Sequence, residues 1–220
     1  MRFAAWLLLS CALFAGAQNA PVPVDQEPRH KLVLKNDYVE VLHLSLPVGE
    51  RTLYHTHSHD RASIDMSDTT LTQQKFGDAE GAPGPTEPRI PEIRTVDQPY
   101  SHRVHNVGQA AYEVLDFEFL KRPTQPGPAP AGAPLAGENA SVRVYRYVLA
   151  PGEKSAQHTH ERPYLIVATT DLQLKMSAPD GQSVVHPVKA GDFHWVDAKV
   201  THTLENAGNA PGEIVEFEMK

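Results

Sequence analysis

The sequence has 220 residues, with 27 acidic and 20 basic side chains, 12 histidines and one cysteine. A formal net charge of −7 argues against the basic surface that nucleic acids and anionic membranes require of a partner. The single cysteine, Cys11, excludes an intramolecular disulfide.

The first 17 residues have the pattern of a secretory signal peptide. Arg2 precedes an apolar run over residues 3–14, and Ala15-Gly16-Ala17 forms a small-x-small cleavage site. The run is too short to span a bilayer comfortably. We therefore expect residues 1–17 to be removed, together with Cys11, and the mature protein to be periplasmic or secreted. Lipid attachment at Cys11 is less favoured, because the apolar run continues past it.

The rest of the chain contains one unit twice. Residues 36–41 resemble residues 139–144 at an offset of 103, and the same offset relates His55-Thr56-His57 to His158-Thr159-His160. Further along the chain the offset becomes 100, which relates His102 to His202 and Asn106 to Asn206. Two copies at nearly constant spacing predict a duplicated structural unit.

Short strands are expected throughout both copies. Residues 39–46 and 142–148 alternate apolar and polar side chains, which is the period of half-buried strands. Turn residues follow both runs, and no amphipathic helix longer than about two turns is expected. The predicted fold class is all-β.

The predicted units are an N-terminal one over residues 28–121 and a C-terminal one over residues 139–220. Between them, residues 122–138 are rich in proline, which cannot donate to a strand ladder, so we expect a linker of some stiffness. A second proline-rich insertion, residues 78–91, is expected to be a long surface loop.

Histidines at repeated positions indicate metal chemistry. His158 and His160 lie two apart on a predicted strand, so their imidazoles leave the same face. With His202 as the third ligand, such a set suits Zn, Cu, Fe or Ni and leaves positions open for water or substrate. The first copy repeats this set with His55, His57 and His102. The alternative is that the histidines are hydrogen-bonded core or surface residues.

These motifs resemble those of the cupin superfamily. The first family motif, glycine, five residues and His-x-His, fits residues 152–160 and 49–57. The second motif ends in histidine, three residues and asparagine, as in residues 202–206 and 102–106. Residues 190–197 look like the glycine-led strand that opens this second motif. The resemblance implies two tandem double-stranded β-helix barrels, a bicupin, after a cleaved signal peptide.

The chain departs from the family at the glutamate of the first motif. Tyr164 or Leu165 occupies that position in the second copy, and Arg61 or Ala62 in the first. A sphere of three histidines and one glutamate is therefore not expected. The resemblance implies three histidines, with Tyr164 either as a further hydroxyl beside the metal or as an ordinary half-buried barrel residue. Arg61 would place a cation near a metal in a poorly solvated interior, so we expect the first barrel to be degenerate.

Other polar residues receive structural interpretations. Asn106 and Asn206 are expected to stabilise turns, and Glu161 to be a solvated charge. The histidines without a repeat partner are expected to be surface or packing residues, namely His30, His43, His105, His186 and His194.

The sequence thus predicts an exported bicupin with one divalent metal ion, Fe, Mn, Ni or Zn, in the C-terminal barrel and a small-molecule ligand or substrate. A metal-dependent enzyme on a small oxygenated substrate, for example a dioxygenase, is the first hypothesis. A non-catalytic cupin that captures a small ligand or metal is the second, and purely structural histidines are the third. Exposed barrel edges promote pairing, so a homodimer stays an alternative, although two barrels in one chain do not require it.

Overall fold

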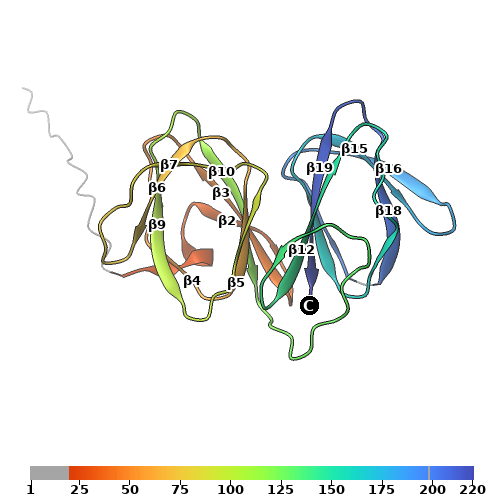
Figure 1. The fold of residues 1–220 in the computed structure, drawn as a ribbon. Helices are drawn as coiled ribbons and strands as arrows, with labels where there is room; N and C mark the ends of the chain where they lie inside the picture. The colour runs from red at the N-terminus through yellow and green to blue at the C-terminus, as the bar shows by residue number, and fades with distance from the viewer. Residues whose placement is uncertain (1–19, 198) are drawn as a thin grey trace, which may run out of the picture.

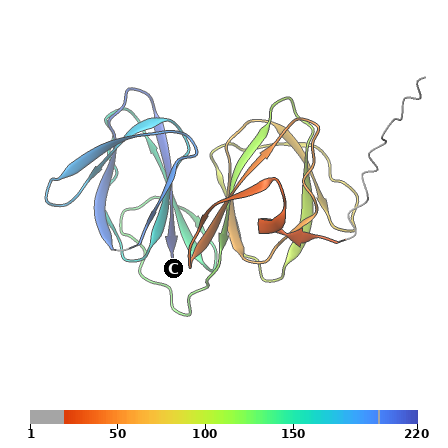
Figure 2. The ribbon, with the colours of Figure 1, turned by 180° about the vertical axis from the view of Figure 1, so that it is seen from behind.

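The structure is a computed structural model that describes residues 20–197 and 199–220. The predicted signal peptide, residues 1–17, lies outside this range. The described chain consists of strands and turns, apart from a 3-10 turn at Val24–Gln26, and contains no helix with the length and apolar character needed to cross a membrane. Figures 1 and 2 show two barrels side by side. The all-β, two-barrel prediction is confirmed.

The N-terminal barrel is formed by two five-stranded sheets. Their strand orders are β1-β4-β9-β6-β7 and β2-β3-β10-β5-β8. The strands are β1 (Val22–Pro23), β2 (His30–Lys35), β3 (Val39–Leu46), β4 (His55–His57), β5 (Asp60–Asp65), β6 (Thr70–Lys75), β7 (Gly84–Pro85), β8 (Pro91–Arg94), β9 (Tyr100–Asn106) and β10 (Tyr112–Phe119).

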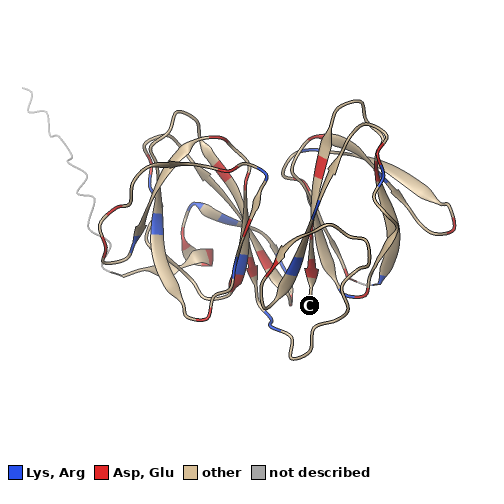
Figure 3. Cartoon of the chain, viewed as in Figure 1, with Lys and Arg blue, Asp and Glu red and all other residues tan. Residues whose placement is uncertain are grey.

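The C-terminal barrel repeats this plan with a five-stranded and a four-stranded sheet. Their strand orders are β11-β12-β19-β14-β17 and β13-β18-β15-β16. The strands are β11 (Leu135–Glu138), β12 (Val142–Leu149), β13 (His158–His160), β14 (Tyr164–Ala168), β15 (Leu172–Ser177), β16 (Ser183–Val188), β17 (Phe193–Val196), β18 (Val200–Asn206) and β19 (Gly212–Met219). Acidic and basic residues are interspersed over both barrels (Figure 3).

Two segments differ from the sequence-based expectation. Strand β1 lies before residue 28, the expected start of the N-terminal unit. It nevertheless pairs in parallel with β4, with Val22 opposite His55. Strand β11 lies inside the expected linker and pairs with β12 in antiparallel orientation. Residues 135–138 contain no proline, so their backbone N–H groups are available to the ladder that the preceding prolines cannot join.

The turns beside the His-x-His strands are held by the repeated asparagines, as predicted. The Asn206 amide donates hydrogen bonds to the carbonyls of Leu149 (3.0 Å) and Ala210 (2.8 Å), and its oxygen accepts one from the Gly208 N–H. Asn106 makes the equivalent three bonds in the first barrel. Gly152 adopts a φ of 76°, which residues with a Cβ rarely take, and its N–H reaches the Asn206 carbonyl at 2.7 Å.

Strands β10 and β19 are buried along nearly their whole length, because both of their faces are covered. Successive strand side chains point to opposite faces. Hence Glu216 and Glu218 share the face that lines their own barrel, where both contact His160. The alternate residues, including Phe217, join an apolar cluster between the barrels.

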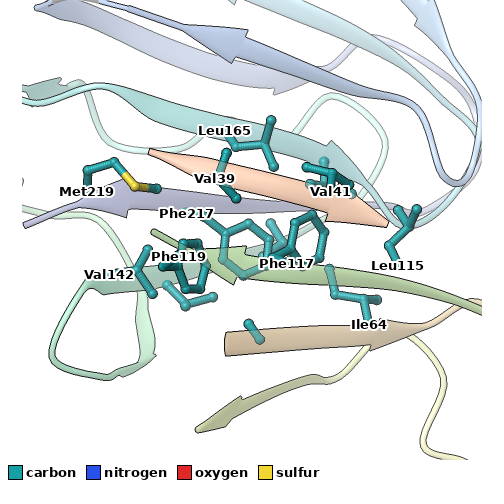
Figure 4. Close-up of a cluster of buried hydrophobic side chains, with 14 residues drawn as sticks. Val39, Val41, Ile64, Leu115, Phe117, Phe119, Val142, Leu165, Phe217 and Met219 are labelled. Atoms are coloured by element: carbon teal, nitrogen blue, oxygen red, sulfur yellow. The ribbon is translucent and has the colours of Figure 1, made fainter. Parts of the chain in front are cut away.

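That cluster, which we call the seam, consists of buried apolar side chains from both barrels (Figure 4). Phe117 of β10 and Phe217 of β19 pack against each other with ring centroids 4.5 Å apart. Both side chains are fully buried. The seam therefore makes the two barrels share one hydrophobic core.

Replacing Phe217 with alanine should lower the free energy of unfolding by about 3–5 kcal/mol, because it removes a buried ring and leaves a cavity in the seam. Val148→Ala on β12, where the side chain is 57% exposed, is the control and should change it little. Urea unfolding followed by circular dichroism measures both. Equal effects of the two substitutions would contradict a shared core.

Candidate metal centre

The three predicted histidines of the C-terminal barrel are brought together by strand pairing. Strand β13 runs antiparallel to β18 with His158 opposite His202, and His160 lies two residues further along β13 on the same face. All three are buried, with 3%, 0% and 2% exposure for His158, His160 and His202. The expectation that they face the barrel interior is met.

A carboxylate that the sequence reasoning missed joins them. Glu216 Oε2 lies 3.2 Å from His160 Nε2 and 3.4 Å from His158 Nε2, and Glu216 Oε1 lies 3.4 Å from His202 Nε2. The four side chains each offer one ligand atom, all within 4.8 Å of one another. The glutamate absent from the first motif thus has a counterpart in space on β19, which the expectation of histidines alone did not include.

Hydrogen bonds from the outer ring nitrogens orient two of these imidazoles. The Nδ1–H of His158 donates to the Ala156 carbonyl at 3.0 Å, and that of His160 donates to Glu218 Oε1 at 3.2 Å. With the outer proton on Nδ1, the neutral form of each ring has its lone pair on Nε2, which points at the other ligand atoms.

The arrangement fits a divalent ion. His158 Nε2 and His202 Nε2 are 2.9 Å apart, a distance at which two lone pairs repel unless a proton or cation lies between them. Glu216 Oε1 is buried and makes no hydrogen bond within the described chain. Three imidazole nitrogens and one carboxylate oxygen are donors that transition metals accept.

Two tyrosines border this group. The Tyr164 ring stacks on His160 with centroids 4.0 Å apart, and it is fully buried rather than half-buried. Its hydroxyl has no hydrogen-bond partner among the described residues. The Tyr147 hydroxyl lies 3.0 Å from His158 Nε2. Burial and the Glu216 charge raise the pKa of both phenols, so they stay protonated.

The N-terminal barrel repeats the register but not the charges. His55 lies opposite His102, and His57 Nε2 is 3.1 Å from His102 Nε2. These three are buried and form a second group of ligand atoms within 4.8 Å. Burial lowers the pKa of His55 to about 4 and that of His102 to about 2, so both are neutral near pH 7. His59 is exposed and takes no part.

Arg61 enters this first interior, as its position in the sequence suggested. Its guanidinium forms a buried ion pair with Asp116 and donates to the Tyr100 hydroxyl at 3.0 Å. Asp116 is the repeat equivalent of Glu216. The carboxylate that meets three histidines in the second barrel is therefore engaged by a cation in the first.

Each barrel also has a cavity, and the two differ in chemistry. The cavity of the C-terminal barrel, about 520 Å³, is lined mainly by apolar side chains that include Ile166, Met176 and Ile214. The corresponding cavity of the N-terminal barrel, about 630 Å³, has Ser63 and Gln73 at the positions of Ile166 and Met176.

Comparison with known proteins identifies the family. A model described as a cupin domain matches residues 145–218. The beta-alanine degradation protein BauB of Pseudomonas aeruginosa is 34% identical over 83 residues, which are 38% of this chain and 86% of that protein. The chain belongs to the cupin superfamily.

Solved structures agree on the cupin fold. AerE from Microcystis aeruginosa superposes with a TM-score of 0.57 at 12% identity, covering 88% of this chain and 98% of that one. A variant of oxalate decarboxylase from Bacillus subtilis gives a TM-score of 0.52 at 12% identity, covering 82% and 68% of the two chains. At this identity the likeness shows the two-barrel cupin fold alone.

In the metal-free protein, we expect the second cupin barrel to make the free energy of unfolding depend on pH. Burial by itself lowers the pKa of His160, but hydrogen bonds to Glu216 and Glu218 outweigh it and raise the pKa to about 9, above the ordinary 6.5. The folded-state pKa is raised above the ordinary value. The stabilisation from this ion pair is therefore fully present below pH 6.5 and is lost as the pH rises to 9.

Glu216→Gln should flatten that decline, because the neutral amide no longer favours the imidazolium. Free energies of unfolding at pH 6.5 and 9, measured for the chelator-treated parent and the variant, give the difference. Comparing the two proteins cancels the contributions of other titrating groups to the free energy of unfolding. The same change with pH in both would rule out this coupling.

Proposed function

We propose that the C-terminal cupin barrel holds one divalent metal ion with His158, His160, His202 and Glu216, and that the protein is a metal-dependent enzyme acting on a small oxygen-bearing molecule. The observation that carries this is the convergence of three buried imidazole Nε2 atoms on one buried carboxylate. A mixed imidazole and carboxylate set suits Fe, Mn, Ni or Zn. Such an ion supplies Lewis acidity or, if iron, reactivity with dioxygen.

The cavity supports a ligand with an apolar body. Ile166 is the next residue after Tyr164 on the inward face of β14, and Ile214 is the one before Glu216 on β19, so the cavity adjoins the proposed metal group. Its volume of about 520 Å³ lies in the range of small-molecule sites. The apolar lining would exclude water and leave the oxygen atoms of the ligand to face the metal group.

The two tyrosine hydroxyls would orient that oxygen. Both phenols stay protonated because burial raises their pKa, so each acts as a hydrogen-bond donor rather than as a base. Tyr147 is within 3.0 Å of His158 Nε2, and Tyr164 has a buried donor without a partner in the described chain. Unpartnered buried donors are where a ligand gains specificity.

Non-catalytic capture is the second candidate, and the cavity lining favours it. The titratable side chains that line it, His186, Asp192 and His194, are exposed, so none is a buried general base. A screen of metal-loaded protein against beta-alanine, suggested by the name of the relative, and against apolar carboxylic acids separates the two candidates. Product formation or dioxygen consumption supports an enzyme, and saturable binding without either supports capture. Export after removal of residues 1–17 is part of the proposal and rests on the sequence pattern.

Loss of one proposed ligand should weaken metal binding in this barrel. Untagged His202→Ala should bind Mn²⁺ at least ~10-fold more weakly than the parent, as measured by calorimetry on chelator-stripped protein. His194→Ala, which alters an exposed cavity histidine, should bind like the parent. If His202→Ala keeps the parent affinity, the site is elsewhere.

Tyr164→Phe should raise the free energy of unfolding of the metal-free protein by about 1 kcal/mol, because it removes a buried hydroxyl that lacks a partner. The ring, and hence its stacking on His160, is retained, so Mn²⁺ affinity should stay within about twofold. Urea unfolding and calorimetry provide the two measurements. A clear loss of stability would show that the hydroxyl is structural rather than reserved for a ligand.

A further inference from the structure

His30 belongs to the interior of the N-terminal barrel. The sequence offers no repeat partner for it, yet its side chain is almost fully buried and its ring centroid lies 4.6 Å from that of His55. His55 is in turn 4.6 Å from His102 and 5.0 Å from His57. Four buried imidazoles therefore gather in this barrel: the ligand atoms of His55, His57 and His102 lie within 4.8 Å of one another, and His30 stands beside them, outside that group.

A buried carboxylate holds the His30 ring in one orientation. The Nδ1–H of His30 donates to Glu27 Oε2 at 2.7 Å, and Glu27 Oε1 accepts the Leu53 N–H at 3.0 Å. This leaves the lone pair of His30 on Nε2, which lies 3.7 Å from Asp116 Oδ2, too far for a hydrogen bond. A carboxylate behind a histidine is the usual support of a metal-bound imidazole.

Two of the other proposed ligands have the same kind of support. His57 Nδ1 donates to Glu118 Oε1 at 2.7 Å, and His55 Nδ1 donates to the Leu53 carbonyl at 3.0 Å. A small cavity of about 30 Å³ has all four histidines in its lining. That volume is enough for a water molecule, and hence for a bare metal ion.

The two barrels use different groups at this place. Leu44, which lies opposite His30 across β2 and β3, is the repeat equivalent of Tyr147. In the second barrel Tyr147 brings a hydroxyl to His158, whereas in the first His30 brings an imidazole to His55, the counterpart of His158. The first barrel thus gains a nitrogen where the second has an oxygen.

The equivalent carboxylate of the first barrel is not available to a metal ion. Asp116, the counterpart of Glu216, is ion-paired with Arg61. The small cavity is lined by two guanidiniums, but Arg61 is paired with Asp116 and Arg94 with Glu92, and Glu27 adds a carboxylate behind His30. The surroundings therefore still favour a cation.

We propose that His30 is the fourth ligand of an all-nitrogen metal site with His55, His57 and His102, and that this site takes Cu²⁺ in preference to Mn²⁺. Imidazole ligands suit Cu²⁺, whereas Mn²⁺ is suited by carboxylates, and Cu²⁺ also stands highest and Mn²⁺ lowest in the general order of affinities. The site is separate from the one in the C-terminal barrel and does not depend on it.

The test uses the full chain in a His202→Ala background, which weakens the second barrel. Cu²⁺ is added to chelator-stripped protein, with calorimetry for affinity and electron paramagnetic resonance for nitrogen couplings. The background should bind one Cu²⁺ with four coupled nitrogens. Adding His30→Asn should weaken Cu²⁺ binding at least ~10-fold and leave three coupled nitrogens. The Asn amide keeps the hydrogen-bond donor to Glu27 but lacks Nε2.

His43→Asn is the matched control, since His43 lies on β3 with its side chain 43% exposed and paired with Glu113. It should leave both measurements unchanged. Unaltered affinity and four nitrogens in the His30→Asn protein would overturn the proposal. If that protein fails to fold, imidazole ¹⁵N shifts of the background protein with Zn²⁺ decide instead: four coordinated rings support the proposal, and three refute it.

Discussion

Burial of β10 and β19 on both faces is the constraint on which the rest of the molecule depends. One face of each strand directs carboxylates into its own barrel, and the other directs aromatic rings into the seam between the barrels. A slip of register by one residue would exchange Glu216 with Phe217, burying charge in the seam and apolar rings beside the histidines. Folding of the seam and assembly of the site are therefore the same event.

The two barrels share a frame but have different interiors. Arg61 and Tyr164 occupy equivalent positions, and each decides what the nearby carboxylate can do. Arg61 neutralises Asp116, whereas Tyr164 is uncharged and leaves Glu216 to three histidines. The two copies thus share the histidine register, while the difference between Arg61 and Tyr164 changes the electrostatics around it.

The C-terminal site contains buried polar groups that do not stabilise the fold. The hydroxyl of Tyr164 and the Nδ1 of His202 are buried and lack hydrogen-bond partners within the described residues. Such groups lower stability, and they are commonly retained where a ligand or ion completes them. Glu216 Oε1 is a third such atom, so three of them gather around one buried carboxylate.

The sequence by itself determined the strands, the duplication, the shared face of His158 and His160, and the asparagine turns. These depend on a period of two and on turn chemistry, which are local properties of the chain. Only the tertiary structure decided that Glu216 joins His160, 56 residues away, that Arg61 pairs with Asp116, and that His30 stands beside His55. Those contacts arise from closure of the sheets into barrels, which joins residues that no local pattern relates.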